Sequence, residues 1–326
     1  MRILVTGGLG FIGSHYVRTL LGGGYRGSEN ASVTVLDPVT DAGKRDAIPR
    51  SHPRLTFAHG NVLDRDVLSH VVSGQDAVVH FAAETHVDRS LTAATDFVRT
   101  NVEGTQRLLD ACLAAGVRRV VQISTAEVYG DTDQGMRTER SALAPNSPYA
   151  ASKAAADLLA LSYFRTHRLG VSVTRCCNNY GPYQHPEKFI PRAITSLLEG
   201  RPVPIYGNGQ QVREWLHVAD HCHAVHQVLT SGRPGEIYNI GGGTAMTNLT
   251  VAHRLAELCG AEPDLIQHVT DRNGHGPRHG LDQTKLEREL GQAPRIQFTK
   301  GLEQTVAWYQ DNPQWWKAIT MSGGRP

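Results

Sequence analysis

Short apolar, β-branched runs alternate with longer stretches of helical periodicity through the first 180 residues of the chain. This alternation is typical of βαβ units, in which helices cover a parallel sheet. Helices are expected to begin near Gly10, Ala93 and Ser147, and an apolar stripe predicts a further helical stretch over 101–115. The expected strands cover residues 2–6, 33–37, 55–58, 77–82, 119–124 and 171–175.

The pattern changes after Asn178. Beyond this point prolines and glycines become dense, at 181–191, 200–209 and 241–243. Helical periodicity returns at 248–259 and 301–311. A region of this kind is expected to form a smaller, loop-rich domain.

The two regions predict an α/β protein with a Rossmann-type, doubly wound parallel sheet and a smaller, loop-rich C-terminal substrate domain. The first domain is expected to cover residues 1–178. Residues 213–229 have strand-then-helix character and predict a return to the sheet, so a segment of about 213–240 is assigned to the first domain as well. The second domain is then expected to cover 179–212 and 241–326.

Composition narrows the class of protein. The 326 residues correspond to about two domains, and 33 Lys and Arg against 31 Asp and Glu leave a formal charge of +2. That charge indicates neither a nucleic-acid groove nor an anionic membrane surface as a partner. No run approaches the ~18 apolar residues of a membrane span, and the apolar N-terminus stops before Gly7, so no signal peptide is expected. The five cysteines form no C-x-x-C, which is typical of reduced thiols in a cytoplasmic enzyme.

A glycine-rich loop follows the first expected strand and opens a helix. Its sequence, GGLGFIG, places Gly7, Gly10 and Gly13 where a tight turn, a close approach to a pyrophosphate and helix–strand packing need them. The N-terminus of the helix adds a field that favours phosphate. Asp37 ends the second expected strand, where a carboxylate accepts hydrogen bonds from a ribose 2′-hydroxyl and repels a 2′-phosphate. The sequence therefore predicts dinucleotide binding, with NAD favoured over NADP.

Tyr149 and Lys153 form a Y-x-x-x-K pair in the helix expected after Ser147. Residues four apart share one face of a helix, so the ammonium is expected beside the phenol. A nearby cation lowers the pKa of a phenol from about 10 toward neutrality, and Tyr149 is then expected to act as a general base.

Together, the glycine-rich loop, the strand that ends in Ser124 and Thr125, and the Y-x-x-x-K pair resemble the extended short-chain dehydrogenase/reductase superfamily. A narrower resemblance, to nucleoside-diphosphate-glucose 4,6-dehydratases and to the dTDP-glucose enzymes in particular, spans nearly the whole chain. It rests on the segments HFAAETHVDRS at 80–90, PNSPYAASK at 145–153, RCCNNYGPYQHPEKFIP at 175–191 and REW at 213–215.

The resemblance implies an NAD-dependent lyase that holds its cofactor tightly through each turnover. It implies that Tyr149 removes the proton of the sugar 4-hydroxyl as hydride leaves C4, while Thr125 binds O4. Glu127 stands at the position of the base that takes the C5 proton. Water then leaves from C6 and hydride returns there, which gives a 4-keto-6-deoxy sugar.

The expected binding residues form two sets. The NAD set is Gly7, Gly10, Phe11, Ile12, Gly13, Asp37, Asn61, Val62, Ala82, Ala83, Tyr149 and Lys153. The nucleotide-sugar set is Glu84, Thr85, Asn179, Lys188, Arg213, Asn248, Arg272 and His275. Arg213 is the strongest candidate of the second set, because a guanidinium binds phosphate through two parallel hydrogen bonds. Without the resemblance, Asn179 and Asn248 are interpreted as turn residues. Glu84 and Thr85 follow an apolar strand at its carboxyl end, where open α/β sheets bind ligands, and helix capping is the alternative for them.

No metal site is predicted. His217, His221, His223 and His226 lie close together in the sequence but lack the closed spacing of a structural zinc site. We expect them to line an ordinary helix that follows a strand.

Ala126 is the main departure from the dehydratase pattern. Residues 124–130 read STAEVYG where the family has STDEVYG, and the missing aspartate is the acid that protonates the departing C6 oxygen. Further departures favour natural divergence over a lone engineered substitution; they are Asp41, Lys44, Asn61, Gly276 and His279.

Two other enzymatic functions therefore stay open. Nucleotide-sugar 4-epimerases need no acid for a leaving group, and nucleotide-glucuronate decarboxylases lack the aspartate while keeping the glutamate. A non-catalytic nucleotide-binding protein is disfavoured. A protein that had lost its activity would accumulate substitutions at catalytic positions, and would not selectively keep Tyr149, Lys153, Thr125 and Glu127. In the superfamily two long helices of each subunit form a four-helix interface, so a homodimer built on 101–115 and 148–167 is expected.

Overall fold

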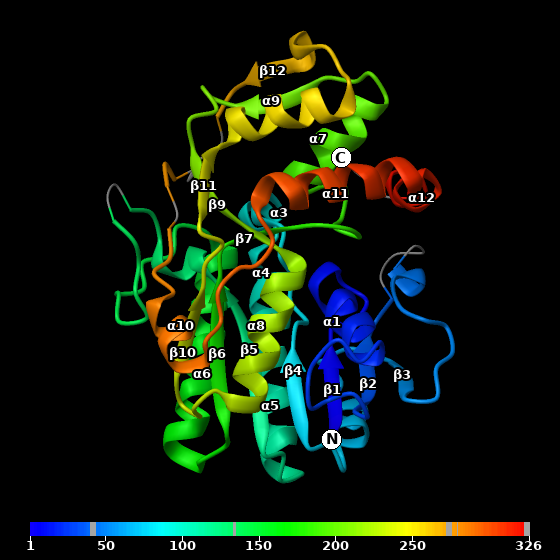
Figure 1. Ribbon diagram of the computed structural model, residues 1–326. Helices are drawn as coiled ribbons and strands as arrows, with labels where there is room; N and C mark the ends of the chain where they lie inside the picture. The colour runs from blue at the N-terminus through cyan, green and yellow to red at the C-terminus, as the bar shows by residue number, and fades with distance from the viewer. Residues whose placement is uncertain (40–43, 133–134, 272–275, 279, 323–326) are drawn as a thin grey trace.

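The computed structural model describes residues 1–39, 44–132, 135–271, 276–278 and 280–322. Its larger part is built on a seven-stranded sheet, and a smaller part lies beyond one end of these strands (Figure 1). The six strands predicted from the sequence are confirmed within a few residues, and a seventh joins them. The strands of the large sheet are β1 (Arg2–Thr6), β2 (Ser32–Asp37), β3 (Leu55–His59), β4 (Ala77–His80), β5 (Arg119–Thr125), β6 (Val171–Cys176) and β10 (Ile237–Ile240).

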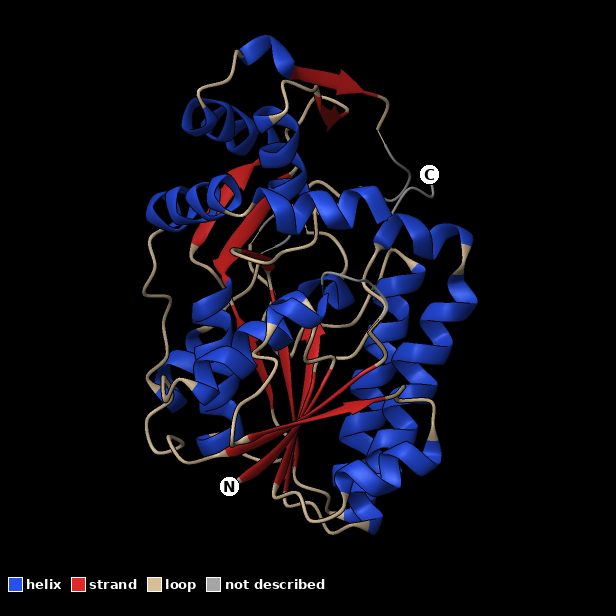
Figure 2. Ribbon diagram, turned by 90° about the vertical axis from the view of Figure 1, so that its right-hand side faces the viewer, coloured by secondary structure: helices blue, strands red, loops and turns tan. Residues whose placement is uncertain are grey.

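Helices cover both faces of this sheet, as Figure 2 shows. Helices α1 (Phe11–Leu21) and α8 (Val218–Ser231) pack on one face. Helices α2 (Arg65–Val72), α5 (Gly104–Ala114) and α6 (Pro148–His167) pack on the other. This arrangement confirms the predicted doubly wound α/β fold.

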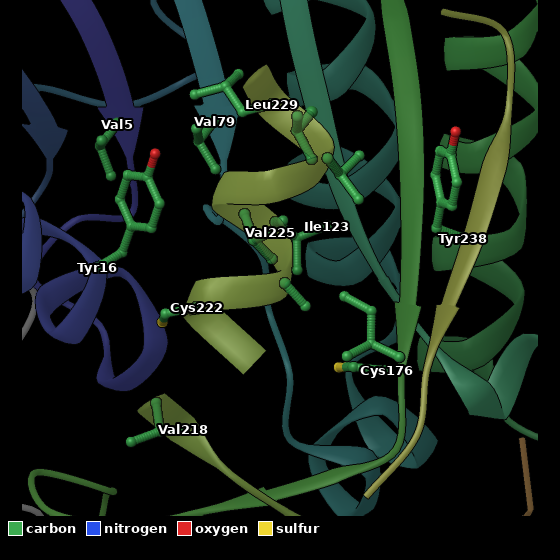
Figure 3. Close-up of a cluster of buried hydrophobic side chains, with 14 of the residues drawn as sticks. Val5, Tyr16, Val79, Ile123, Cys176, Val218, Cys222, Val225, Leu229 and Tyr238 are labelled. Atoms are coloured by element: carbon green, nitrogen blue, oxygen red, sulfur yellow. The ribbon is translucent and has the colours of Figure 1, made fainter. Parts of the chain in front are cut away.

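Alternate side chains of the strands enter two separate cores, because successive residues of a strand point to opposite faces. Ile3 and Val5 of β1 pack in the core beneath α1 and α8, and Leu4 packs in the core on the other face. Figure 3 shows Val5 with Val79 and Ile123 of neighbouring strands, on the face that α8 covers. The strands are buried on both faces, which explains why their sequences are almost continuously apolar.

The seven strands are parallel and lie in the order β10-β6-β5-β4-β1-β2-β3. From β1 the chain moves outward to β2 and β3, and then returns to the other side of β1 with β4. The strand order therefore reverses between β1 and β4. In open α/β sheets, ligands bind at the carboxyl ends of the strands at such a point. The loops that follow Thr6 and His80 meet there.

The smaller part contains a three-stranded sheet in the order β11-β9-β7 and a two-stranded sheet of β12 and β8. The strands are β7 (Asn178–Tyr180), β8 (Val203–Tyr206), β9 (Val212–His217), β11 (Thr244–Thr247) and β12 (Ile266–Val269). The helices that pack around these sheets in a third core are α7 (Phe189–Leu198), α9 (Asn248–Cys259), α11 (Phe298–Asp311) and α12 (Pro313–Ser322).

Strand β9 does not return to the large sheet, as the pattern at 213–229 predicts. It pairs with β7 and β11, and the chain rejoins the large sheet only with β10, which lies beside β6. The pattern of one short strand cannot say which strands will pair with it, because that depends on tertiary packing. The sequence prediction was wrong on this point.

The remaining helical segments are short. The helix expected to begin near Ala93 starts with α4 (Ala94–Phe97) and continues through the π-helical segment η2 (Val98–Glu103) into α5. No helix within the described ranges is both long and apolar enough to cross a membrane. The short segments are η1 (Lys44–Ala47), α3 (Val87–Thr92), α4 (Ala94–Phe97), η2 (Val98–Glu103), η3 (Ala126–Tyr129), η4 (Pro263–Leu265) and α10 (Thr284–Leu290).

A buried carboxylate joins three distant segments where the two parts of the molecule meet. Glu214 of β9 is 2% exposed, and its Oε1 accepts hydrogen bonds from the backbone N–H groups of Gly242 and Gly243 at 2.8 and 2.9 Å. Its Oε2 accepts from the N–H of Leu281 at 3.0 Å. Hydrogen bonds to a charged acceptor are stronger than neutral ones, so Glu214 fixes the strand that carries Arg213.

Candidate functional site

The candidate site lies along the carboxyl ends of β1, β2, β4, β5 and β6. At its centre the backbones of Gly7 and Ala82 come so close that a Cβ on Gly7 would lie 2.6 Å from the Ala82 nitrogen. Gly7 also has φ +69°, which favours glycine. A Cβ on Gly13 would lie 2.3 Å from the Gly7 carbonyl oxygen. Two segments of the predicted NAD set, the glycine loop and Ala82-Ala83, are thus brought together.

The N-terminus of α1 is open to an anion. The helix begins at Phe11, its N-cap is Gly10, no side chain caps it, and its first turn holds no acidic residue. The first N–H groups of a helix have no partner within the helix, and its dipole places positive charge at this end. A pyrophosphate fits such a terminus.

Asp37 lies at the end of β2 beside the same loop. Its side chain is 6% exposed and accepts hydrogen bonds from the N–H groups of Leu9 and Val39, at 3.1 and 3.0 Å. These bonds hold a carboxylate next to the glycine loop, where it can accept hydrogen bonds from a ribose. The Asn61 side chain is engaged differently, because its Oδ1 accepts from the N–H of Leu63 in a local turn. Val62 is 4% exposed and packs in the core of the larger part.

Three predicted catalytic side chains come together where β5 ends. Thr125 Oγ1 accepts a hydrogen bond from the N–H of Glu127 at 3.2 Å, which caps the η3 turn. The same hydroxyl shares a hydrogen bond with the Tyr149 phenol, and the charge of Glu127 acts on that phenol as well. Ser147 caps α6 by accepting from the N–H of Ala150, and so fixes the first turn, which carries Tyr149.

The pKa of Tyr149 is shifted in the direction opposite to the sequence prediction. Burial and the negative charge of Glu127 raise it well above the ordinary value of 10.0, and the hydrogen bond with Thr125 only partly opposes this. Lys153 lies four residues along α6, but its Nζ donates to the carbonyl of Ile123 at 2.7 Å. The expectation that Lys153 lowers this pKa is therefore wrong for the protein without a ligand. A cation bound beside Tyr149 would lower it.

Asn101 is a residue of the site that sequence reasoning missed. It lies in the π-helical segment η2 and is 1% exposed. Its Oδ1 accepts from the N–H of Glu84 at 2.8 Å, and its Nδ2 donates to the Glu84 carbonyl and to Ser152 Oγ at 3.0 and 2.9 Å. Asn101 thus ties the loop after β4 to α6 beside Lys153. The sequence signal was a polar residue within an apolar helical stripe, and π-helical turns are frequent at functional sites.

The predicted sugar-binding residues of the two parts meet through Lys188. Its Nζ donates to the carbonyl of Thr85 at 2.9 Å, across 103 residues of sequence. Glu84 is placed by Asn101, and its carboxylate lies 3.7 Å from Arg89. Neither Glu84 nor Thr85 caps the following helix, whose N-cap is His86.

The other predicted members of the sugar set are placed differently. Asn179 Nδ2 donates to the carbonyl of Cys177 at 3.0 Å, and its Oδ1 is buried with no hydrogen-bond partner in the described parts of the chain. Arg213 is 5% exposed, and its guanidinium donates to the carbonyls of Val212 and Gly276, both at 2.9 Å. Asn248 is the first residue of α9. The predictions on Arg272 and His275, and the departures at Asp41 and His279, fall outside the described residues.

Ala126 brings no proton donor to the site. It is 6% exposed and packs in the apolar core on the α1 and α8 face of the sheet. His217 caps α8, and His226 hydrogen-bonds Tyr16 and Ser28 of distant segments. Both ring nitrogens of His221 are buried with no hydrogen-bond partner among the described residues. Within the described ranges, no group of three or more His, Cys, Asp or Glu residues could hold a metal ion.

Comparison with known proteins agrees with this geometry. Residues 3–241 match the NAD dependent epimerase/dehydratase family. The dTDP-glucose 4,6-dehydratase of Streptomyces niveus is 54% identical over 98% of this chain and 96% of its own. The crystal structure of a dTDP-glucose 4,6-dehydratase from Streptomyces venezuelae, with NAD bound, has a TM-score of 0.96 and 53% identity over 98% of this chain and 100% of that one. A UDP-glucose 4-epimerase of Thermotoga maritima has a TM-score of 0.88 and 29% identity over 96% and 100%.

Gly13→Ala is expected to weaken dinucleotide binding by about tenfold or more, equivalent to ~1.4 kcal/mol, because its methyl group would displace the Gly7 carbonyl from the loop. The measurement is the dissociation constant for NAD by calorimetry. Gly22→Ala, at the other end of α1, is the control, since its Cβ would meet nothing closer than the Arg18 carbonyl oxygen, at 3.3 Å, and lies away from the loop. Equal affinities of Gly13→Ala and the unmodified protein would contradict the assignment of this loop.

Proposed function

The chain belongs to the NAD dependent epimerase/dehydratase family, and we propose that it is a lyase of that family, which converts dTDP-glucose to a 4-keto-6-deoxy sugar. The observation that carries the proposal is the cluster of Tyr149, Thr125 and Glu127 at the end of β5. The dTDP-glucose 4,6-dehydratase of Streptomyces niveus, at 54% identity against 29% for the epimerase, supports dehydration over epimerisation.

The residues around the glycine loop fit NAD. The uncapped N-terminus of α1 suits the pyrophosphate, and the anchored carboxylate of Asp37 suits the hydroxyls of a ribose. When bound, oxidised NAD supplies an acceptor for the hydride of C4, which is later returned to C6, and a positive charge that lowers the pKa of Tyr149. Lys153, one turn farther along α6, adds a second positive charge on the same face of the helix.

Tyr149 and Thr125 act at the sugar 4-hydroxyl. The Tyr149 phenolate takes the proton of that hydroxyl, and Thr125 holds O4 by a hydrogen bond. The hydrogen bond between the two side chains lowers the pKa of Tyr149 and so opposes part of the upward shift that burial and Glu127 cause. A positioned base of this kind contributes roughly 10²–10⁴-fold to the rate.

Glu127 acts at the neighbouring carbon. Once C4 is a ketone, the C5 proton becomes acidic and the Glu127 carboxylate removes it. The hydrogen bond from the Glu127 N–H to Thr125 Oγ1 keeps the two residues within one short turn. Thr125, the N-cap of η3, and Glu127 within η3 thus serve adjacent carbons of the sugar, and water leaves from C6.

The smaller part supplies donors for the diphosphate of the substrate. These donors are Arg213, which β9 holds in place, and Lys188, which reaches across to Thr85. The buried Oδ1 of Asn179 is an acceptor, so it suits a hydroxyl of the substrate and not its diphosphate. In this proposal NAD is bound by the first domain, residues 1–178 and about 213–240. The nucleotide sugar is bound mainly by 179–212 and 241–326, with Glu84 and Thr85 contributing from the first domain.

Ala126 favours a second candidate function. A 4-epimerase or a nucleotide-glucuronate decarboxylase needs no acid for a leaving C6 oxygen, and Ala126 offers none. In a dehydratase without that acid, solvent water must protonate the departing oxygen. Elimination then becomes slow relative to oxidation at C4.

We also propose a homodimer in the cytoplasm. The exposed faces of α3, η2, α5 and α6 carry large apolar side chains, namely Leu91, Val98, Leu113 and Leu158, which are 48%, 52%, 37% and 56% exposed. A two-fold interface would cover them and pair the two helices of each subunit. All five cysteines are free thiols, which fits a reducing compartment.

Incubation with dTDP-glucose is expected to give a product lighter by one water molecule, detected by mass spectrometry. UDP-glucose, UDP-N-acetylglucosamine and UDP-glucuronate serve as competing substrates. Tyr149→Phe should reduce turnover by about 10²–10⁴-fold, because it removes the base. Loss of carbon dioxide from UDP-glucuronate, or an isomer of unchanged mass from either UDP-hexose, would replace dehydration by the second candidate function.

Ala126→Asp is expected to accelerate elimination by about 10²-fold, since it restores a proton donor for the C6 oxygen. The measurement is the rate of 4-keto-6-deoxy product formation in a quenched-flow experiment. Glu127→Gln is the companion variant, and it should abolish exchange of the C5 hydrogen with deuterated solvent. No gain from Ala126→Asp, in a protein that turns over another nucleotide sugar efficiently, would rule out dehydration.

Light scattering at micromolar concentration is expected to give twice the chain mass of 35.6 kDa. Leu158→Glu should shift the protein to monomer, because it places a charge in the proposed apolar interface. Val269→Glu is the control, since Val269 is 39% exposed but lies on β12, away from these helices. A monomer in the unmodified protein would exclude the dimer.

A further inference from the structure

A buried ion pair beneath the site has no part in the proposed reaction. Asp157 on α6 is fully buried and Arg175 on β6 is 2% exposed, and Arg175 Nε donates to Asp157 Oδ2 at 2.9 Å. Ser124 Oγ donates to the same oxygen at 2.9 Å. The other carboxylate oxygen, Oδ1, is buried and has no hydrogen-bond partner in the described parts of the chain.

Stability alone does not account for such a pair. Desolvation offsets much of the attraction between buried charges, and apolar side chains of similar volume are often as stable or more so. A buried carboxylate oxygen without a hydrogen bond adds a further cost. Burial accordingly raises the pKa of Asp157, while Arg175 opposes that shift. The buried charge of Asp157 is therefore unfavourable for stability, which points to a role toward a neighbouring group.

Lys153 is that group. It precedes Asp157 by one turn of α6, so the two share a face of the helix. Lys153 is 4% exposed; burial lowers its pKa, and the charge of Asp157 is the main effect that raises it again. Two other titratable groups face the ammonium from neighbouring strands. Burial raises the pKa of the Cys176 thiol to about 12 and lowers that of His80 to about 3, so both are neutral near pH 7.

The remaining charged and titratable neighbours leave Asp157 as the counterion of Lys153. Tyr149 faces Lys153 from the same helix, but it is neutral in the protein without a ligand because its pKa is raised. Glu127 lies farther off and acts on Tyr149 and Lys188. Arg175 is a cation and cannot stabilise another one. Its pairing with Asp157 instead fixes where the carboxylate lies.

We propose that Asp157 is a positioning residue, which keeps Lys153 protonated beneath Tyr149 while Arg175 and Ser124 hold its carboxylate in place. The proposal rests on the proposed function, in which a charged Lys153 is required. Besides Lys153, the charge of Asp157 acts on Tyr149, where it is the smallest of the effects that raise the pKa of the phenol.

The anchoring of Arg175 explains how Asp157 keeps its place. The Arg175 guanidinium lies 4.7 Å from the centre of the Tyr129 ring, and the Tyr129 hydroxyl donates to Asn239 Oδ1 at 2.8 Å. Asn239 is fully buried in β10 and donates to the carbonyls of Arg137 and Asp282. Arg175 is therefore held from two sides, and Asp157 stays one turn from Lys153.

A double-mutant cycle tests the coupling without turnover. Asp157→Asn is made in the full chain and in Lys153→Met, and urea unfolding of the four proteins is followed in excess NAD. Asp157→Asn is expected to lower the unfolding midpoint in both backgrounds, because it leaves Arg175 without its buried partner. The loss should be larger when Lys153 is present, since the ammonium then loses its counterion as well. Equal shifts in both backgrounds would overturn the proposal.

The pH dependence of turnover gives a second readout. Removal of the Asp157 charge lowers the pKa of Lys153 further, so Lys153 loses its proton at lower pH. In Asp157→Asn the basic limb of the kcat profile is expected to move to lower pH by about one unit or more. Thr174→Val on β6 is the matched control, since it removes a buried hydroxyl that has no hydrogen-bond partner in the described parts of the chain, next to Arg175 in the sequence. It should leave the position of that limb unchanged.

A further variant keeps the proposal testable if Asp157→Asn does not fold. Asp157→Leu with Arg175→Met replaces the whole pair by apolar side chains, which buried ion pairs often tolerate. It should also show the downward shift of the basic limb, and an unshifted limb in this folded protein would refute the role of Asp157. Failure of the unmodified protein to dehydrate dTDP-glucose would overturn the proposed function instead, and the unfolding cycle would still report on Asp157.

Discussion

The close approach of the Gly7 and Ala82 backbones is the constraint on which the rest of the site depends. It occurs where the strand order reverses, so the loops after β1 and β4 must pass each other with no side chain between them. Because all seven strands are parallel, every residue that follows a strand emerges at the same edge. Asp37 and Thr125 thus reach one site although 88 positions separate them in the sequence.

The elements that could be predicted are those with local signals. Six strands of the large sheet, the N-cap at Ser147 and the glycine loop follow from periodicity and from residue type over a few positions. The sheet to which β9 belongs could not be predicted, because its partners lie at 178–180 and 244–247. Asn101 could not be predicted for the same reason. Its role consists of contacts with Glu84 and Ser152, and no local sequence pattern connects these distant positions.

Electrostatics was the least predictable property of the site. The spacing of Tyr149 and Lys153 correctly places both on one helix. The spacing alone does not predict that the phenol is buried or that the carboxylate of Glu127 in η3 acts on it. Those two effects determine the direction of the Tyr149 pKa shift. The same is true of Asp157, whose charge matters only because the surrounding strands and helix exclude water from Lys153. A motif identifies the groups, and the fold decides their ionisation.

The contact between Lys188 and Thr85 has a consequence for selectivity. Before a ligand binds, the ammonium already has an acceptor in the Thr85 carbonyl. A ligand that recruits Lys188 must offer a better one, and a phosphate oxygen is better because it carries charge. A neutral sugar hydroxyl offers no such advantage, so free glucose would exchange one neutral acceptor for another and gain little. The Thr85 carbonyl thus competes with the ligand for the Lys188 ammonium, and only a ligand with a charged group such as a diphosphate displaces it.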